Sequence, residues 1–265
     1  MAAYDFAAQR LFVEEPLAAG TQIVIEADRA NYLLNVLRLR DGAAIIVFNG
    51  RDGEWRATLS QTTRRTTVLQ ISDRTRTQTA GPDIDYCFAP LKHARLDYVV
   101  QKAVEMGARR LQPVITRRTQ VSRVNRERMR ANAIEAAEQC GILSVPEVIP
   151  ELPLERFLAN RDPSRLLILC DEDAPRADPL VALGAAPPAT QYALLIGPEG
   201  GFDPRERETL LAQSGVVRIS LGPRILRADT AGVAAMALLQ AVRGDLRAGD
   251  LQMSDLRTPD TMSPR

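Results

Sequence analysis

Two loops in the second half of the sequence combine glycine, proline and charged residues in a spacing that suits ligand binding. The first is Gly197-Pro-Glu-Gly-Gly201, which directly follows the apolar run Tyr192–Ile196. Three glycines and a proline in five residues predict a tight turn whose backbone can approach a ligand closely. The turn is neither GxGxxG nor a P-loop, because it lacks a Gly-Lys-Ser/Thr, so it indicates neither a Rossmann nor a Walker site. A sharp strand-to-helix turn without a ligand explains the spacing equally well.

The second loop, Leu221–Thr230, joins a predicted strand to the last predicted helix. It contains two arginines, two apolar residues and one acid, namely Arg224, Ile225, Leu226, Arg227 and Asp229. Its backbone can bind an uncharged ring and its guanidinium groups can bind a substrate, and open α/β sheets place ligands at such strand ends. In the alternative interpretation, the two apolar residues dock the loop on the core and the arginines are solvated.

Positive charge is concentrated between Lys92 and Arg130, although the whole chain is nearly neutral, with 34 Lys and Arg against 33 Asp and Glu. This segment holds eleven basic and three acidic residues, a local balance of +8. Such a cluster attracts the phosphate backbone of a nucleic acid. The alternative is the solvated face of an arginine-rich chain.

The elements that must position these loops fall into two groups. Short β-prone runs occupy 22–26, 44–48, 54–59 and 67–71, with one or two helical turns at Asn31–Leu37. Asn49-Gly50 and Asp52-Gly53 lie between two of these runs and predict a hairpin. Residues 1–73 are therefore expected to form a small β-barrel domain. The polar stretch 74–83, which contains Gly81-Pro82, is expected to be a linker.

From residue 84 the pattern changes to an alternation of strands and helices. Strands are predicted at 84–89, 111–115, 165–170, 192–196 and 216–221, and helices at 94–106, 125–139, from 203 to about 214, and at 230–242. Asp203 and Glu206 have the spacing of a capping box at the start of the third of these helices, with Pro204 in its first turn. The apolar runs are continuous rather than alternating, which is typical of a parallel sheet covered on both faces. We therefore expect one α/β domain over 84–250, followed by a flexible polar tail at 251–265.

Length and composition exclude several classes of protein. The 265 residues are 45% hydrophobic and 25% charged, the balance of a globular protein with one large or two modest domains. There is no run of 18 apolar residues and no signal-peptide pattern at the N-terminus. Cys87, Cys140 and Cys170 have neither disulfide nor metal-ligand spacing. We expect a cytoplasmic protein with no metal and no membrane partner.

Several segments together resemble the RsmE family, SPOUT-superfamily methyltransferases that modify uridine N3 in small-subunit (16S) ribosomal RNA. The matching segments are Arg10-Leu-Phe-Val, Val36-Leu-Arg-Leu-Arg, Gln101–Gly107, Glu135–Gly141 with Val145-Pro146, Leu195–Phe202 and Leu221–Arg227. The last two are about 24 residues apart, in this order, and are the most specific. The resemblance covers most of the chain.

The resemblance implies a PUA-like β-barrel followed by a SPOUT α/β domain with a trefoil knot. It also implies a homodimer that takes S-adenosyl-L-methionine (SAM) as methyl donor. The implied donor-binding residues lie in the two loops and the strand end before the first: Leu195, Ile196, Gly197, Pro198, Glu199, Gly200, Gly201, Leu221, Gly222, Arg224, Ile225 and Leu226.

The implied reaction needs uracil N3 to lose its proton, so a nearby positive charge that stabilises the anion would help. The sulfonium methyl group is already activated, so no metal is required. We expect Arg227 in the stabilising role, with Arg10 and Arg224 as weaker candidates and Glu199 and Asp229 as polar organisers. The residues expected to contact 16S rRNA or the small subunit are Arg10, Arg38, Lys92, Arg123 and Arg126.

Three departures from the family pattern concern RNA docking and the start of the last helix. Ala228-Asp-Thr230 replaces the usual Thr-Glu-Thr, Ile142 replaces a basic residue, and Asn31 replaces a histidine. None of them affects the loop glycines. Two other functions stay open at this point: a non-catalytic RNA-binding module, and a SPOUT methyltransferase that acts on tRNA.

Overall fold

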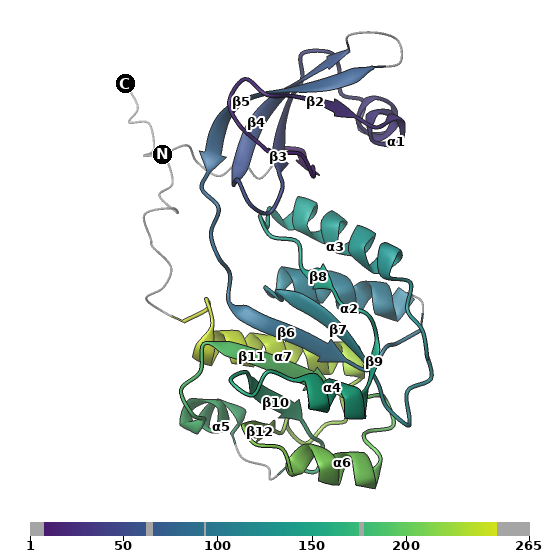
Figure 1. Ribbon diagram of the computed structural model, residues 1–265, viewed down its shortest axis with the longest axis vertical. Helices are drawn as coiled ribbons and strands as arrows, with labels where there is room; N and C mark the ends of the chain where they lie inside the picture. Colours follow the sequence, from purple (N-terminus) through teal and green to yellow (C-terminus); the bar gives the residue numbers. More distant parts are fainter. Residues whose placement is uncertain (1–7, 62–65, 93, 175–177, 248–265) are drawn as a thin grey trace, which may run out of the picture. The chain divides into compact units, whose positions relative to one another are not determined.

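The computed structural model describes residues 8–61, 66–92, 94–174 and 178–247 (Figure 1). Within these ranges the chain forms two compact units. The first contains the described residues up to Ala80 together with Ala137–Ser144, and the second contains Gly81–Ala136 and the described residues from Val145 onward. The predicted tail at 251–265 lies outside the described residues. Among the helices of the described ranges, none is long and apolar enough to cross a membrane.

The first unit is built on a five-stranded sheet in the order β1-β3-β4-β5-β2. These strands are β1 (Arg10–Phe12), β2 (Gln22–Ile25), β3 (Ala44–Phe48), β4 (Glu54–Gln61) and β5 (Thr67–Arg76). β1 pairs with β3 in parallel, and the other pairs are antiparallel. A hydrophobic core lies on one face of the sheet and includes Leu33, Ile45, Leu59 and Leu69.

The turn between β3 and β4 confirms the predicted hairpin. Asn49 is buried, and its side-chain oxygen accepts hydrogen bonds from the backbone amides of Arg51 and Asp52 at 3.0 and 2.9 Å. Gly50 and Gly53 adopt positive φ angles of 79° and 87°, which glycine reaches without a steric penalty. The local turn chemistry therefore determines this connection.

Three features of the first unit differ from the sequence-based expectation. The predicted turns at 31–37 are a short helix α1 (Ala27–Asn31) continued by a π-helix, η1 (Tyr32–Val36). Strand β5 continues to Arg76, three residues into the predicted linker, because Arg76 pairs with Glu54 in the sheet register and in a 3.2 Å ion pair. Residues 137–144, which were expected in the α/β domain, group with the first unit.

The second unit contains a parallel sheet in the order β12-β10-β11-β6-β7-β8, with β9 paired to β7. Its strands are β6 (Asp83–Phe88), β7 (Arg110–Ile115), β8 (Glu147–Val148), β9 (Leu152–Pro153), β10 (Leu166–Cys170), β11 (Gln191–Ile196) and β12 (Val216–Ile219). Every pair in it is parallel. The continuous apolar runs of β10 and β11 are buried on both faces, as predicted.

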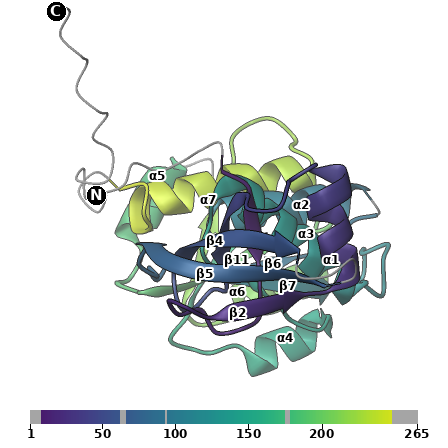
Figure 2. The same cartoon turned by 90° about the horizontal axis from the view of Figure 1, so that it is seen from above.

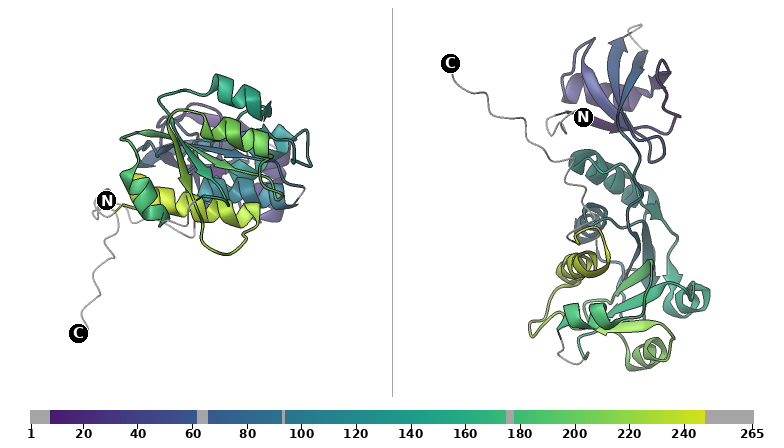
Figure 3. Two further views of the ribbon diagram at one scale, coloured as in Figure 1. Left: turned by 90° about the horizontal axis from the view of Figure 1, so that it is seen from below. Right: turned by 90° about the vertical axis from the view of Figure 1, so that its left-hand side faces the viewer.

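Helices cover both faces of this sheet, as Figures 2 and 3 show. They are α2 (Ala94–Glu105), α3 (Arg126–Cys140), α4 (Leu154–Asn160), α5 (Pro179–Ala185), α6 (Pro204–Leu211) and α7 (Ala228–Arg243). On one face, Phe157 of α4 and Leu210 of α6 pack in a cluster with Leu167 and Leu195 of the sheet. On the other face lie α2, α5 and α7, where Gly232 of α7 lets the helix approach Tyr86 more closely than a Cβ atom would permit.

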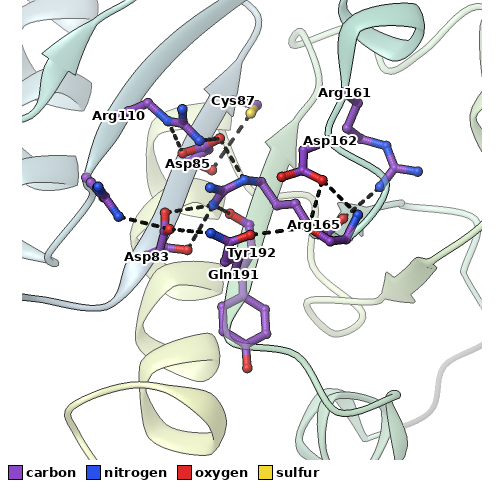
Figure 4. A network of polar contacts seen from close by, with 11 residues as sticks. Asp83, Asp85, Cys87, Arg110, Arg161, Asp162, Arg165, Gln191 and Tyr192 are labelled. Carbon is purple, nitrogen blue, oxygen red and sulfur yellow. Dashed lines mark hydrogen bonds and ion pairs between the residues drawn. The ribbon is translucent and has the colours of Figure 1, made fainter.

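A network of ion pairs and hydrogen bonds joins the amino-terminal ends of β6, β7, β10 and β11 (Figure 4). The side chain of Arg165 is 5% exposed, and its Nη1 lies 2.9 Å from Asp83 Oδ1 while its Nε lies 3.2 Å from Asp85 Oδ2. Arg110 binds both oxygens of Asp85, at 2.7 and 2.8 Å. Burial raises the pKa of Asp85 above its ordinary value, against the lowering effect of Arg110 and Arg165. Charged side chains thus hold the amino-terminal ends of these strands together.

Candidate active site

A cavity of about 290 Å³ lies at the carboxyl ends of β10, β11 and β12. These strands are neighbours or next neighbours in the sheet, so the loops that follow them meet at one edge. Ten of the twelve predicted donor-binding residues line it: Ile196, Gly197, Pro198, Glu199, Gly201, Leu221, Gly222, Arg224, Ile225 and Leu226. The two loops that are about 24 residues apart in sequence therefore form one concave site.

The other two predicted donor-binding residues do not line the cavity. Leu195 is completely buried and packs in the hydrophobic cluster beneath the sheet. Gly200 is exposed on the outer side of the turn, where a Cβ atom would meet Arg118 Cδ at 3.6 Å. Both residues lie outside the lining of the cavity, and their part in donor binding stays a prediction.

The cavity also has a wall that the sequence reasoning missed. It is formed by Cys170, the last residue of β10, by Asp171–Asp173 directly after it, and by Phe202 and Arg207 after the glycine-rich turn. The continuous apolar strand at 165–170 was predicted, and a ligand loop after it could have been expected from the rule that parallel strands present their carboxyl ends at one edge. The sequence alone does not give the strand order, which places β10 between β11 and β12.

Asp171 anchors this third wall. Its side chain is only 3% exposed, and it accepts hydrogen bonds from Arg207 and Arg218, whose Nε atoms lie 3.2 and 2.8 Å from its oxygens. Burial acts to raise the pKa of Asp171, but the bond from Arg207, a backbone amide and the two positive charges outweigh it and hold the pKa below its ordinary value. The carboxylate therefore stays ionised at neutral pH.

The glycine-rich turn is held from behind by the basic segment. Arg118 donates from Nη1 to the Gly200 carbonyl at 2.6 Å, and the backbone amide of Arg117 donates to Glu206 at 2.8 Å. Asp203 and Glu206 form the predicted capping box at the start of α6. The turn thus leads directly into a well-capped helix, which fixes where its backbone groups point.

One arginine contacts both predicted loops. Arg95, in the first turn of α2, lies 2.7 Å from Glu199 through Nη1 and 2.9 Å from Asp229 through Nε. The hydrogen bond from Arg95 is the main reason why the pKa of Asp229 lies below its ordinary value. Arg95 was not among the residues predicted for the site, because its two partners are far away in sequence.

Comparison with known proteins connects this geometry to a family. Residues 78–240 match the model of an RNA methyltransferase domain, and residues 25–72 match an RNA methyltransferase PUA domain. The chain is 30% identical over 240 residues to the ribosomal RNA small subunit methyltransferase E of Synechocystis, covering 89% of this chain and 78% of that protein. This chain belongs to the RsmE family. The resemblance found in the sequence is therefore confirmed.

Other proteins to which this chain is similar agree with this assignment. The Rickettsia conorii enzyme of the same name is 27% identical over 86% of this chain and 93% of its own length. A crystal structure of the Neisseria gonorrhoeae ribosomal RNA small subunit methyltransferase E bound to S-adenosyl methionine has a TM-score of 0.77 and 28% identity, covering 91% of this chain and 100% of that one. A Legionella pneumophila methyltransferase in complex with SAM has the same TM-score and identity.

The residues predicted to act on the RsmE substrate differ in accessibility. Arg227 is exposed at the N-cap of α7 and has no ion-pair partner within the described ranges. Arg224 is also exposed and lines the cavity. Arg10, in contrast, belongs to the first unit, where its side chain is 4% exposed and lies 3.3 Å from Glu54. This burial indicates a structural role for Arg10 and weakens the prediction that it contacts substrate or RNA.

Four of the eleven basic residues of the basic segment pair with carboxylates from outside it. Arg109 pairs with Asp83, Arg110 with Asp85 and Arg117 with Asp203, in addition to the two pairs of Arg95. Lys92, Arg123 and Arg126 are exposed and have no ion-pair partner in the part of the chain that the structure describes. Arg38, two residues after the end of η1, is exposed as well and has a φ of 56°.

No group of three or more His, Cys, Asp or Glu side chains among the described residues could hold a metal ion. The cavity instead offers backbone groups at a tight turn, apolar surface from Ile196 and Phe202, and charged groups from Glu199 and Arg207. This mixture suits an organic ligand that carries a ring and several polar groups.

Proposed function

We propose that this protein is a SAM-dependent methyltransferase that methylates N3 of a uridine in 16S ribosomal RNA of the small subunit. The observation that carries the proposal is the cavity where the Gly197–Gly201 turn and the Leu221–Leu226 loop meet, in a chain of the RsmE family. Curated relatives are named ribosomal RNA small subunit methyltransferase E, and related structures contain SAM. Both facts support the proposal.

The residues of the cavity fit the donor. A Cβ atom at Gly197 would meet the Phe202 ring, and Gly201 has a φ of 67°, so both positions of the turn favour glycine. Apolar surface suits the adenine ring, and Glu172 and Glu199 supply negative charge for a cationic ligand. The donor supplies a methyl group already activated by the sulfonium. The protein must hold the donor, orient the uracil and favour loss of the N3 proton.

In this proposal Arg227 stabilises the uracil N3 anion. Its guanidinium is exposed next to the cavity-lining residues Leu226 and Ala228, and no described carboxylate neutralises it. A charge directed at the developing anion in a partly desolvated site can be worth about 2–4 kcal/mol. Arg224 is a second candidate, whereas Glu199 and Asp229 organise the site. Arg10 ranks last because it is buried and paired with Glu54.

The remaining features of the proposal concern the architecture and the partners. We propose that the first unit is a PUA-like RNA-binding barrel, that the second contains a trefoil knot at the cavity, and that the protein acts as a cytoplasmic homodimer. The match of residues 25–72 to a PUA domain supports the first of these. Arg38, Lys92, Arg123 and Arg126 are the proposed RNA contacts. Their exposure is consistent with that role.

The experiment that tests the function is methyl transfer from labelled SAM to 16S rRNA and to purified small subunits, followed by mass-mapping of the product. One new N3-methyluridine is the expected result, and the same nucleotide should lose its methyl group in a strain that lacks the gene. Methylation of tRNA instead would indicate a different SPOUT activity. RNA binding without any transfer would indicate a non-catalytic binding module.

A further inference from the structure

We infer that Arg95 is a positioning residue of the methyl-transfer site, because its guanidinium fastens two walls of the cavity to each other. The inference rests on the proposed function, and it adds a residue that neither loop motif contains. Arg95 reaches Glu199 and Asp229, which are 104 and 134 residues away in sequence. Three separate elements therefore meet at one side chain.

Each of the two carboxylates belongs to a cavity wall. Glu199 lines the cavity within the glycine-rich turn. Asp229 lies in the first turn of α7 between Ala228 and Ala231, both of which line the cavity. The second oxygen of Asp229 accepts a hydrogen bond from the backbone amide of Thr230 at 2.8 Å, so both oxygens of this carboxylate have hydrogen-bond partners. Removal of Arg95 would release the turn and the start of the helix from one another.

The position of Arg95 makes a role in helix stability a poor explanation. It is the second residue of α2, and a positive charge in the first turn of a helix is opposed by the helix dipole. Asp229, in contrast, is a carboxylate in the first turn of α7, where the dipole favours it. The presence of a positive charge at this position is therefore best explained by the two carboxylates that it binds, and not by any stabilisation of α2.

The geometry also requires arginine. The two bonds leave from different nitrogens, Nε and Nη1, of one planar group, at 2.9 and 2.7 Å. A lysine ammonium is a point charge that cannot reproduce this fork. Because a misplacement of about 1 Å at a reacting centre can cost about 100-fold in rate, a change in the spacing of the two walls should be visible in catalysis as well as in donor binding.

The test compares Arg95→Ala and Arg95→Lys with Arg128→Ala. Arg128 also holds a carboxylate with two bonds, to Asp97 at 2.9 and 2.6 Å, but neither residue lines the cavity. Donor affinity is measured by calorimetry with SAM and its demethylated product. Amide hydrogen exchange of Gly197–Gly201 and Ala228–Ala231 is followed in the donor-free protein, and thermal melting is recorded for each variant.

For Arg95→Ala we expect donor binding at least 10-fold weaker, faster exchange in both segments and a transfer rate about 100-fold lower at saturating donor. Arg95→Lys should recover part of each effect, and Arg128→Ala should match the parent in donor affinity and in the exchange of both segments. Parent-like affinity and exchange in Arg95→Ala would overturn the inference. An equal loss of donor affinity and equally faster exchange in Arg128→Ala would also overturn the inference.

A double variant tests whether Arg95 acts through Asp229. Arg95→Ala combined with Asp229→Asn should bind the donor no more weakly than Arg95→Ala alone, because both changes break the same contact. Fully additive losses would contradict the inference. If the parent protein itself does not bind SAM, the proposed function fails instead, and the exchange measurements on the donor-free protein still decide whether Arg95 joins the two segments.

Discussion

The ring of Phe202 lies against the backbone of Gly197, where a Cβ atom on residue 197 would come within 2.8 Å of Cε2. Phe202 lines the cavity and also packs against the hydrophobic cluster under α4 and α6. The ring can make room for a side chain at residue 197 only by leaving its place in the cluster or by moving into the cavity. Position 197 therefore has no room for a side chain, although nothing in its own sequence neighbourhood would show it.

We predict that Gly197→Ala weakens donor binding at least 10-fold, which corresponds to about 1.4 kcal/mol. The added methyl group would push the Phe202 ring toward the space that the donor would occupy. Gly200→Ala is the matched control in the same turn, because its Cβ atom would only touch Arg118 Cδ at an ordinary 3.6 Å. Calorimetry on both variants checks the prediction, and equal affinities for the two would contradict it.

Arg227→Ala should slow methyl transfer without unfolding the protein. The side chain is exposed and makes no ion pair with the described residues, so its loss leaves the packing of α7 intact. A lost contact of about 2–4 kcal/mol to the uracil anion corresponds to a rate about 30- to 1000-fold lower. Arg227→Lys should restore only part of the rate, because an ammonium lacks the planar fork.

The measurement is single-turnover transfer to small-subunit RNA, with a melting curve and a donor titration on the same preparations. We expect the melting temperature and the donor affinity to stay within error of the parent. If the transfer rate of Arg227→Ala equals that of the parent, Arg227 has no catalytic role, and Arg224 becomes the next candidate.

Charge reversal at Arg123 and Arg126 should weaken RNA binding and flatten its salt dependence. Both side chains are exposed and unpaired within the described ranges, unlike most arginines of the basic segment. Loss of two phosphate contacts lowers the slope of log affinity against log salt by about 1.4 to 1.8. Donor affinity should not change, because neither residue lines the cavity.

The control for this experiment is the double reversal Arg156→Glu and Arg205→Glu. These residues are exposed on α4 and α6, outside the basic segment, and the change in net charge is the same. Filter binding or fluorescence anisotropy between 50 and 300 mM salt (a range of about sixfold) separates the two cases. Identical slopes for the two double variants would mean that only the overall charge matters.

Arg165→Ala should destabilise the second unit strongly. It would leave Asp83 and Asp85, each with a side chain 15% exposed, without their main buried partner, and breaking such a pair costs about 3–5 kcal/mol. Arg109→Ala removes another partner of Asp83, but Arg109 is 64% exposed, so the expected loss is about 0–1 kcal/mol. Urea unfolding of both variants measures the difference, and equal losses would refute this account of the network in Figure 4.

The stability of the protein should depend on pH through Asp171. Because the pKa of Asp171 lies below its ordinary value in the folded protein, its contribution is present at neutral pH and is lost as the pH falls through that lower pKa. Asp171→Asn should cost about 1.5–3 kcal/mol at pH 7, through weaker bonds to Arg207 and Arg218. The difference in unfolding free energy between Asp171→Asn and the parent should become smaller below about pH 4. Chemical unfolding between pH 3 and pH 7 (a span of about 4 units) checks this, and a deficit that is independent of pH would contradict it.

Local chemistry made several parts of the fold predictable from the sequence. The hairpin turn at Asn49–Gly53, the capping box at Asp203 and the apolar strands that end at Cys170 and Ile196 are all found where they were expected. Each depends on residues that are close together in sequence. The shortest elements, β8 and β9 with two residues each, were missed because two residues carry no periodicity.

The sequence by itself determined the two ligand loops, the α/β pattern and the family, since glycine-rich turns and apolar runs are local signals. Only the tertiary structure decided what surrounds those loops. Strand order brings Cys170–Asp173 into the cavity, turns Gly200 outward, and lets Arg95 join Glu199 to Asp229. It also pairs four residues of the basic segment with distant carboxylates and buries Arg10 against Glu54. The physical reason is that a parallel sheet aligns the ends of strands that are far apart in the chain, and no local pattern specifies which ends will meet.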